Sequence, residues 1–431
     1  MTDDLKRSFL ITTWEGGGSV GPMLTLARKL RDAGHRVRVM SDECNRPETE
    51  ALSLPFVPWT RAPSRSDRTR ESETIRDWAA DDPLEGVGLA VEEAFARTAH
   101  AYAQDVIEEL QREPADLVVT NDFLFGVMAG CEKIGQPLVA MACNINMFPV
   151  DDAPLAGPGS DRTLSAEEAA QAEAMRNAVR AVVEWSLPAL NDARALLGLP
   201  PLSSVLEQFD YARSNLVAIS RYFDMVQEPI PQRFRYVGPQ LDEIAWSQSP
   251  AIRSRRTGRP LVLVSFSTTF QNHIALLQRV LDGLGALPVD VIVTLGPAIR
   301  CDDLHPGPNC PLIPSAPHGP LMSEASLVVT HGGHGTLARA MAHDVPMLVI
   351  PIGRDQHGNA ARVEAHGTGL SLPPEASAWE VRGAAERLLT DPSFAVAAAK
   401  LGQAVRREAE ECDIVREVER LCCPTVMSVA A

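Results

Sequence analysis

The chain has 431 residues, which is too long for one hydrophobic core, so two domains of about 200 residues each are expected. Its 56 acidic and 40 basic residues give a formal net charge of −16, which argues against a nucleic-acid groove or an anionic membrane as a partner, because both attract clustered Lys and Arg. No apolar run is long enough for a membrane span, no secretory signal is visible, and the eight cysteines are scattered, so a cytoplasmic protein with reduced thiols and no metal site is expected.

The first half of the chain predicts strands and helices in alternation. An apolar run at residues 8–14 is followed by a glycine-rich turn, a helix that begins near Pro22 and a second strand over residues 35–42. A β–turn–α–β unit of this kind implies parallel strands. A long helix is expected over residues 87–112 and another over 167–197, bent at Pro188. Further strands are expected at residues 54–59, 115–122, 137–143, 215–220 and 234–239.

The first turn also spells G-x-G-x-x-G, at Gly16, Gly18 and Gly21, and Asp42 follows about 20 residues later. This is the fingerprint of a dinucleotide site and supports an alternative function, an oxidoreductase that uses NAD or FAD. Pro22 argues against it, because proline removes a backbone N–H near the helix start where a pyrophosphate would bind.

Two other features of the first half are candidates for function. Residues 61–83 are polar and of mixed charge; a solvated loop is the simpler interpretation, and a mobile lid over a substrate cleft is the alternative. The strand at residues 115–122 ends in Asn121 and Asp122. Because the carboxyl ends of strands face the ligand crevice in an open α/β sheet, Asp122 is a site candidate, although it could equally cap the following helix.

The apolar pattern fades over residues 240–259, which predicts a linker between an N-terminal domain (1–239) and a second domain (260–392). Residues 393–431 predict a C-terminal helix that crosses back to the first domain. The second half restarts the alternation, with strands expected at residues 260–266, 289–296, 311–319, 326–333 and 346–352. The predicted fold class is α/β, with two Rossmann-like, doubly wound parallel-sheet domains and a cleft between them.

The strongest functional pattern lies in residues 331–359. Gly332, Gly333 and Gly335 carry no Cβ, so backbone N–H groups can approach an anion there. The helix expected from about Thr336 points its positive end at the same place, and His331 and His334 add side-chain donors. The next loop offers Asp355 beside Gln356, which suits neighbouring sugar hydroxyls. An anion site followed by a hydroxyl site predicts a nucleotide-sugar ligand.

Together with Val345-Pro346, Pro351 and Asn359, these motifs make residues 260–372 resemble the nucleotide-sugar-dependent glycosyltransferases of the GT-B fold, family 1, in the bacterial branch that decorates natural products. The resemblance implies an inverting, metal-independent transferase without a cofactor, in which a dTDP- or UDP-sugar is a co-substrate. It implies these donor-binding residues: Ser267, Thr268, His331, Gly333, His334, Gly335 and Thr336 at the diphosphate, Ala316 and His318 at the base, and Asp355 and Gln356 at the sugar.

The chain departs from that family at three positions. Ser267 stands where the family usually has glycine, and Arg339 stands where it often has a glutamate that binds ribose hydroxyls, which favours a deoxythymidine diphosphate sugar. Ser19 stands where many relatives have a histidine base, which an aspartate matching Asp122 orients. A serine at its free pKa is a poor general base, so the expected dyad is absent.

Several routes for the acceptor proton stay open. Asp122 could take it directly, or through Ser19 or a water, and Ser19 would then position the hydroxyl. Glu15 in the same loop could take it instead. An acidic acceptor such as a phenol needs little help, because its pKa is only about 10. Finally, Ser19 could simply form a turn hydrogen bond.

The acceptor is expected to bind in the first domain, in an apolar pocket for a flat or macrocyclic aglycone. The candidate lining residues are Trp14, Phe123, Phe125, Met147 and Phe148, each of which taken alone is more often a core residue. The predicted function is transfer of a sugar to a hydroxyl of a hydrophobic small molecule in natural-product biosynthesis. A non-catalytic nucleotide-sugar-binding homologue and a nucleotide-sugar epimerase are the remaining alternatives, and a homodimer stays open.

Overall fold

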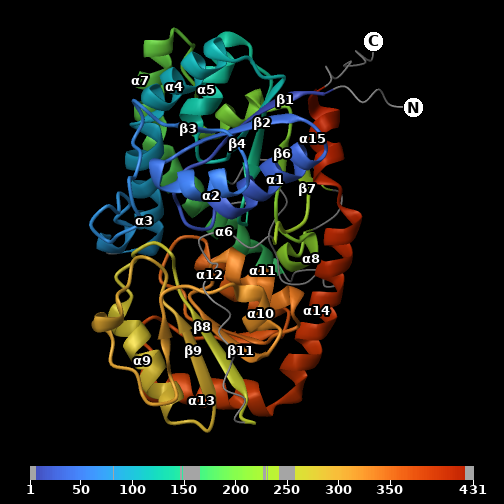
Figure 1. The fold of residues 1–431 in the computed structure, drawn as a ribbon. Helices are drawn as coiled ribbons and strands as arrows, with labels where there is room; N and C mark the ends of the chain where they lie inside the picture. Colours follow the sequence, from blue (N-terminus) through green and yellow to red (C-terminus); the bar gives the residue numbers. More distant parts are fainter. Residues whose placement is uncertain are drawn as a thin grey trace.

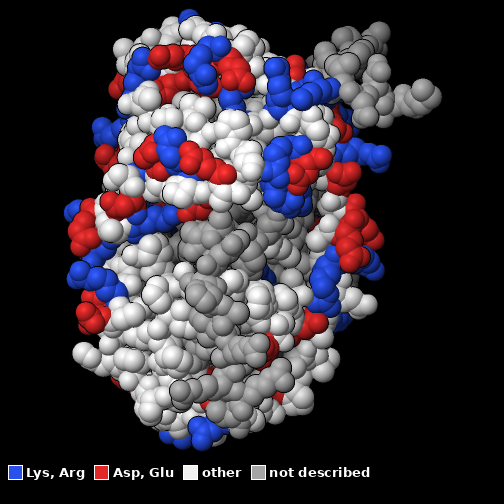
Figure 2. All heavy atoms as spheres, viewed as in Figure 1, with Lys and Arg blue, Asp and Glu red and all other residues white. Residues whose placement is uncertain are grey.

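The computed structural model describes residues 6–80, 82–145, 148, 166–226, 230, 232–241 and 258–422. Most of the predicted linker, and Met147, lie outside the described residues. The chain forms two α/β domains that lie one above the other in Figure 1. None of the helices in the described part is both long and apolar enough to cross a membrane. On the face seen in Figure 2, Lys and Arg are interspersed with Asp and Glu over the N-terminal domain.

The N-terminal domain is built on a seven-stranded sheet in which every paired strand is parallel. The order is β3-β2-β1-β4-β5-β6-β7, so the direction of winding reverses between β1 and β4. A ligand crevice forms at such a switch point, outside the carboxyl ends of the strands. The strands are β1 (Ser8–Thr12), β2 (Arg36–Ser41), β3 (Phe56–Pro58), β4 (Leu117–Asn121), β5 (Leu138–Ala142), β6 (Asn215–Val217) and β7 (Phe234–Tyr236).

The long helices predicted for this domain exist but are interrupted. The helix expected over residues 87–112 is three segments, because a π-helical stretch separates α3 from α4. The bend predicted at Pro188 is confirmed: a 3₁₀ turn ends α6, and Pro188 lies in the first turn of α7, where its missing N–H has no helical partner to lose. The helices are α1 (Val20–Asp32), α2 (Arg46–Ala51), α3 (Pro83–Ala90), η3 (Val91–Ala96), α4 (Ala99–Arg112), α5 (Phe125–Ile134), α6 (Ala166–Val183), α7 (Leu187–Leu197) and α8 (Arg221–Asp224), with shorter turns η1 (Glu43–Asn45), η2 (Asp77–Ala79), η4 (Glu184–Ser186) and η5 (Val205–Tyr211).

The C-terminal domain repeats the same topology with six parallel strands in the order β10-β9-β8-β11-β12-β13, so its switch point lies between β8 and β11. The edge strand β13 (Gly369–Ser371) was not predicted, because its glycine and serine leave no apolar run of the kind that marks the other strands. Its strands are β8 (Leu261–Ser265), β9 (Asp290–Thr294), β10 (Leu312–Ile313), β11 (Ala325–Thr330), β12 (Met347–Val349) and β13 (Gly369–Ser371). Its helices are α9 (Ile274–Gly285), η7 (Cys301–Asp303), α10 (His318–Met322), α11 (His334–Ala342), α12 (Gln356–Ala365) and α13 (Ala378–Thr390).

The end of the chain connects the two domains. Helix α14 (Pro392–Glu411) packs on α11 of the C-terminal domain and on α8 of the N-terminal domain, and it runs along the side of both in Figure 1. Helix α15 (Ile414–Cys422) then packs against α1. Ile414, Val418 and Leu421 join the core cluster that includes Phe9 and Leu26. The last helix is therefore part of the N-terminal domain in space.

Candidate functional site

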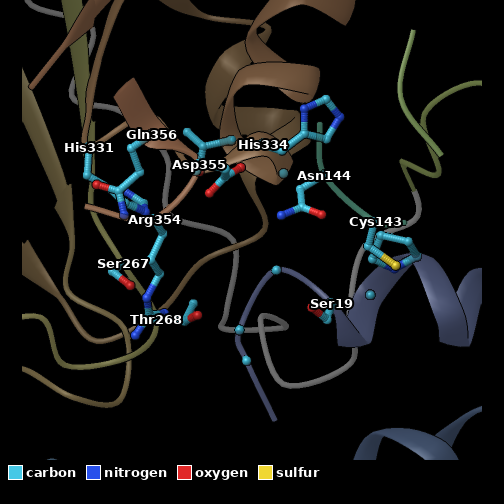
Figure 3. A pocket seen from close by; sticks show the side chains of 18 of the residues that line it. Ser19, Cys143, Asn144, Ser267, Thr268, His331, His334, Arg354, Asp355 and Gln356 are labelled. Carbon is cyan, nitrogen blue, oxygen red and sulfur yellow. The ribbon is translucent and has the colours of Figure 1, made fainter. Parts of the chain in front are cut away.

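A cavity lies between the domains, where the carboxyl ends of both sheets face each other (Figure 3). The N-terminal domain contributes the glycine turn after β1 and residues from α3 and η3, and the C-terminal domain contributes the loops after β8, β9, β11 and β12. The structure brings these predicted site residues together around the cavity: Trp14, Ser19, Phe123, Ser267, Thr268, Ala316, His318, His331, Gly333, His334, Gly335, Thr336, Asp355 and Gln356.

The predicted anion site is the turn from β11 into α11. Gly332 has φ +97°, in the left-handed region that glycine adopts without strain, and a Cβ there would lie 2.8 Å from Val349. Asn359 braces the turn, because its Nδ2 donates to the Gly332 carbonyl at 2.8 Å. Helix α11 begins at His334, two residues earlier than predicted, so the unpaired N–H groups of its first turn face the cavity together with the positive end of the helix.

The two histidines of this turn are buried, and burial lowers the pKa of His331 to about 3 and that of His334 to about 4. Both imidazoles are therefore neutral at pH 7, and His331 can give a diphosphate a hydrogen bond rather than a positive charge. The ring of His334 lies 6.0 Å from that of Phe223, and neither ring nitrogen has a hydrogen-bond partner among the described residues. His334 therefore offers the site its backbone more than its side chain.

The turn after β8 forms a compact hydroxyl cluster. Ser267 Oγ lies 3.0 Å from Thr269 Oγ1, and Gln271 Nε2 donates to Ser267 Oγ at 2.7 Å. Gln271 also lines the cavity, which sequence analysis missed because nothing in its local pattern distinguishes it from a turn residue. Thr268 faces the other domain, since a Cβ on Gly17 would clash with its hydroxyl oxygen. The two switch-point turns are thus in contact across the cleft.

Where β8, β9 and α10 line the cavity, His318 Nε2 lies within hydrogen-bond distance of Ser265 Oγ (3.4 Å) and Thr294 Oγ1 (3.3 Å). Ala316 is buried beside it on the loop that follows β10. These residues close the side of the cavity where the sequence predicted the nucleotide base.

The opposite wall, formed by the N-terminal domain, is apolar. Trp14, Phe95 and Phe123 form an aromatic cluster with ring centroids 4.7 Å apart for Trp14–Phe95 and 5.1 Å for Phe95–Phe123. Val87 and Val91 extend this wall along α3 and η3. Phe95 and these valines were missed, because on a predicted amphipathic helix they are indistinguishable from core residues.

Two predicted acceptor residues need correction. Among the described residues, Phe125 and Phe148 are outside the cavity lining and have 0% and 1% of their surface exposed. Their rings pack on Phe209 at centroid distances of 6.1 and 5.0 Å, beneath the site. They were mistaken for lining because aromatic residues near strand ends serve the core as often as the pocket.

The predicted catalytic residues are separated. Ser19 lines the cavity at the start of α1 and makes no side-chain capping hydrogen bond. Asp122 does not line it: within the described residues both its carboxylate oxygens are buried without a hydrogen-bond partner, and burial raises its pKa to about 8. The structure therefore does not bring Asp122 to the acceptor. Its chain neighbour Phe123 and the nearby Cys143, whose pKa is raised by burial and by the charge of Asp122, line the cavity instead.

Glu15 is not free to act as the base either. One of its carboxylate oxygens accepts from the backbone N–H of Gly17 at 2.9 Å, and the other forms an ion pair with Arg68 Nε at 2.8 Å. These bonds also speak against the oxidoreductase alternative, because the N–H of Gly17 that would meet a pyrophosphate is already bonded. The glycine turn instead contacts the opposite domain through Thr268.

No cluster of three or more His, Cys, Asp or Glu side chains able to hold a metal ion occurs in the described residues. The groups that can meet an anion are the helix α11 N-terminus, the hydroxyls after β8, and the cavity-lining cations Arg339 and Arg354. Two facing doubly wound domains, with the N-terminus of a helix on one wall of the cleft and an aromatic cluster on the other, are the arrangement of the GT-B fold.

Comparisons with known proteins agree with this class. Residues 278–421 match the family described as "Erythromycin biosynthesis protein CIII-like, C-terminal domain". The chain is 27% identical to 4'-demethylrebeccamycin synthase of Lentzea aerocolonigenes over 96% of this chain and 99% of the relative. The glycotransferase of kitacinnamycin shares the fold with a TM-score of 0.72 at 18% identity, covering 96% of this chain and 99% of the other. So does the glycosyltransferase VinC in complex with dTDP, with a TM-score of 0.64 at 18% identity and coverage of 96% and 99%. The chain therefore has the GT-B fold, and its relatives identify it as a glycosyltransferase that is similar to those of natural-product biosynthesis.

Proposed function

We propose that this glycosyltransferase moves a sugar, with inversion and without a metal ion, from a nucleoside diphosphate to a hydroxyl of a hydrophobic small molecule in antibiotic or related natural-product biosynthesis. The observation that carries the proposal is the cavity between the domains, which the N-terminus of α11 lines on the C-terminal side and aromatic and aliphatic residues line on the N-terminal side. Helix α11 and neutral donors would stabilise the leaving diphosphate. Holding both substrates in one cleft would supply much of the rate by orientation.

The donor proposed is a deoxythymidine diphosphate sugar. Arg339 lies one turn into α11, lines the cavity and donates to the Gly335 carbonyl at 2.9 Å. A guanidinium, unlike a carboxylate, cannot accept the proton of a ribose 2′-hydroxyl, so the position lacks the acceptor that would favour a ribonucleotide. The structure of VinC holds dTDP, which supports the same choice. A thermal-shift comparison of dTDP and UDP tests this point: dTDP is expected to raise the melting temperature more, and a clear preference for UDP would contradict it.

The acceptor hydroxyl proposed is an acidic one, such as a phenol, with Ser19 positioning it. Of the described residues on the N-terminal wall, the titratable side chains are Asp77, which is ion-paired, and Cys143, whose pKa burial raises. Neither is a free carboxylate or imidazole that could serve as a strong general base. A hydroxyl that ionises by itself needs no such base.

The experiment incubates the protein with dTDP- and UDP-glucose and a panel of aglycones, and detects products by mass spectrometry. Matched pairs of flat aglycones that differ in a phenol against an aliphatic alcohol decide the acceptor class. Transfer to the phenols, with a rate that rises as each phenol ionises, is the expected result. Equal transfer to aliphatic alcohols would contradict the acidic acceptor, and diphosphate binding without any transfer would favour the non-catalytic alternative.

A further inference from the structure

Arg354 immediately precedes Asp355 and lines the same cavity, yet its side chain is held from the opposite domain. Its Nε and Nη2 donate to the two carboxylate oxygens of Asp77 at 2.7 and 3.3 Å, and its Nη1 donates to Thr269 Oγ1 at 2.9 Å. Asp77 lies in η2 of the N-terminal domain. The ion pair therefore crosses the cleft, and both of its members line the cavity.

The hydrogen-bond inventory of Arg354 leaves donors for a ligand. A guanidinium has five N–H groups, and the bonds to Asp77 and Thr269 use three of them, so one N–H remains on each Nη. Asp355 is complementary. One of its oxygens accepts from Asn359 Nδ2 at 2.8 Å, while the other has no bond to a described side chain. The pair thus presents two donors and one acceptor side by side, and Figure 3 shows both side chains on the cavity wall.

Gln356, the predicted partner of Asp355, is occupied within the protein. Its Oε1 accepts from the backbone N–H groups of Ile352 and Gly353 at 2.8 and 3.2 Å. Its Nε2 donates to Gln271 Oε1 at 2.8 Å. Gln356 therefore fixes the loop before α12 and ties it to the turn after β8, with one N–H left over.

The segment that carries Asp77 is itself fixed to the N-terminal domain. Arg65 pairs with Glu73 at 3.2 Å with both side chains buried, and its backbone N–H donates to Asp42 at 2.9 Å. Arg68 pairs with Glu15 beside the glycine turn. These contacts attach residues 65–73 to the N-terminal domain, and Asp77 lies on the wall of the cleft, where it can position Arg354.

The backbone of Arg354 is also constrained, with φ +54° in the left-handed region that a long side chain rarely adopts. Such a conformation persists only where the surroundings impose it, often at ligand sites. The partly buried ion pair with Asp77 is one contact that holds the side chain here.

We propose that Arg354 joins Asp355 in binding the hydroxyls of the donor sugar, and that Asp77 positions Arg354 from across the cleft. Arg354 donates to sugar oxygens, and Asp355 accepts from a neighbouring hydroxyl. Because Asp77 belongs to the other domain, the sugar subsite is complete only when the domains are together. This inference rests on the proposed function, since it assumes a nucleotide-sugar donor.

The test separates binding of the sugar from binding of the nucleotide. Isothermal titration calorimetry compares dTDP with dTDP-glucose, or UDP with UDP-glucose if UDP binds more tightly. Arg354→Met is expected to raise the Kd of dTDP-glucose about tenfold, as for a lost charge-assisted hydrogen bond, and that of dTDP less than about twofold. Asp77→Asn keeps the size of the side chain and is expected to cause a smaller loss, again confined to the sugar-bearing ligand.

The matched control is Arg70→Met. Arg70 joins the same segment to the same domain, through Asp303 at 3.7 Å and the Phe270 ring at 5.4 Å, but it does not line the cavity. It is expected to change neither Kd. Equal weakening of both ligands by Arg354→Met, or an Arg70→Met effect of the same size, would mean that the pair only holds the domains together and would overturn the inference. Absence of any diphosphate binding by the unmodified protein would instead overturn the proposed function.

Discussion

Asp122 carries an ionisable carboxyl group in a buried position. It follows β4 directly, at the switch point of the sheet, yet its carboxylate is sealed from the cavity and unpaired within the described residues. Burial is the largest cause of the shift that raises its pKa to about 8. At neutral pH the group is thus mostly protonated in the folded state, and folding costs stability that grows with pH, which a side chain that does not titrate would not show.

Replacement of Asp122 by asparagine is expected to raise the melting temperature, and more so at higher pH. The folded carboxyl keeps its proton up to about pH 8, whereas the unfolded one loses it near its ordinary value of 3.8. Its contribution to stability is therefore full below about pH 4 and is lost as the pH rises towards 8. Asparagine does not titrate, so the difference in melting temperature should grow between about pH 5 and pH 8, by roughly 2–4 °C per kcal/mol. An equal shift at both pH values, or a loss of stability, would contradict the burial of an unpaired carboxyl.

At the scale of elements, the turn between β1 and α1 carries the main contact between the two switch points. Gly17 has φ +73°, and the position of its missing Cβ is filled by the Thr268 hydroxyl of the other domain. Gly18 beside it has open space within 4 Å. The glycine pattern that suggested a dinucleotide loop is therefore used at Gly17 for close approach of two domains.

Gly17→Ala is expected to lower turnover by about 10- to 100-fold while the protein stays folded, because the added methyl group pushes the two walls of the cleft apart. Gly34→Ala is the matched control, because Gly34 also has a positive φ (+94°) but has open space within 4 Å and lies outside the cavity lining; it should leave turnover within about twofold. Initial rates with saturating donor, together with melting curves, check both variants. Similar rates for Gly17→Ala and Gly34→Ala would show that the turn tolerates separation of the domains.

At the scale of the whole molecule, the last helix completes the first domain. Val418 is fully buried, and α15 contributes it to the core around β1 and α1. Helix α14 meanwhile contacts both domains, and Arg362 of α12 pairs with Asp224 of α8 at 2.7 Å. Helix α14 and the ion pair between Arg362 and Asp224 thus connect the two domains in addition to the contact at the glycine turn.

Val418→Ala is expected to destabilise the N-terminal domain by about 1–2.5 kcal/mol, since it leaves a cavity in a closed core. Arg416→Ala, exposed on the same helix, should change stability by less than about 0.5 kcal/mol. Thermal denaturation monitored by circular dichroism compares the two. If Val418→Ala melts like Arg416→Ala, helix α15 contributes little to the core.

The sequence by itself determined the local features of this protein. Parallel strands buried on both faces are continuous apolar runs, so their positions could be predicted from the sequence. The alternation of these runs with helical patterns predicted the two α/β domains. The glycines and helix start after β11 predicted the anion site, because a turn and the helix that follows it are set by neighbouring residues. The edge strand β13 escaped prediction, since its residues Gly-Leu-Ser include one apolar side chain and form no apolar run.

Only the tertiary structure decided which side chains meet across the cleft. Asp122 and Phe125 occupy strand-end positions that suit a site, but packing turned them inward. Arg354 and Asp77 are 277 residues apart, and no local pattern links them; the facing of the two domains does. Contacts between distant segments depend on how whole layers pack. The turn after β11 could therefore be predicted from the sequence, whereas the residues of the N-terminal wall and the contact between Arg354 and Asp77 could not.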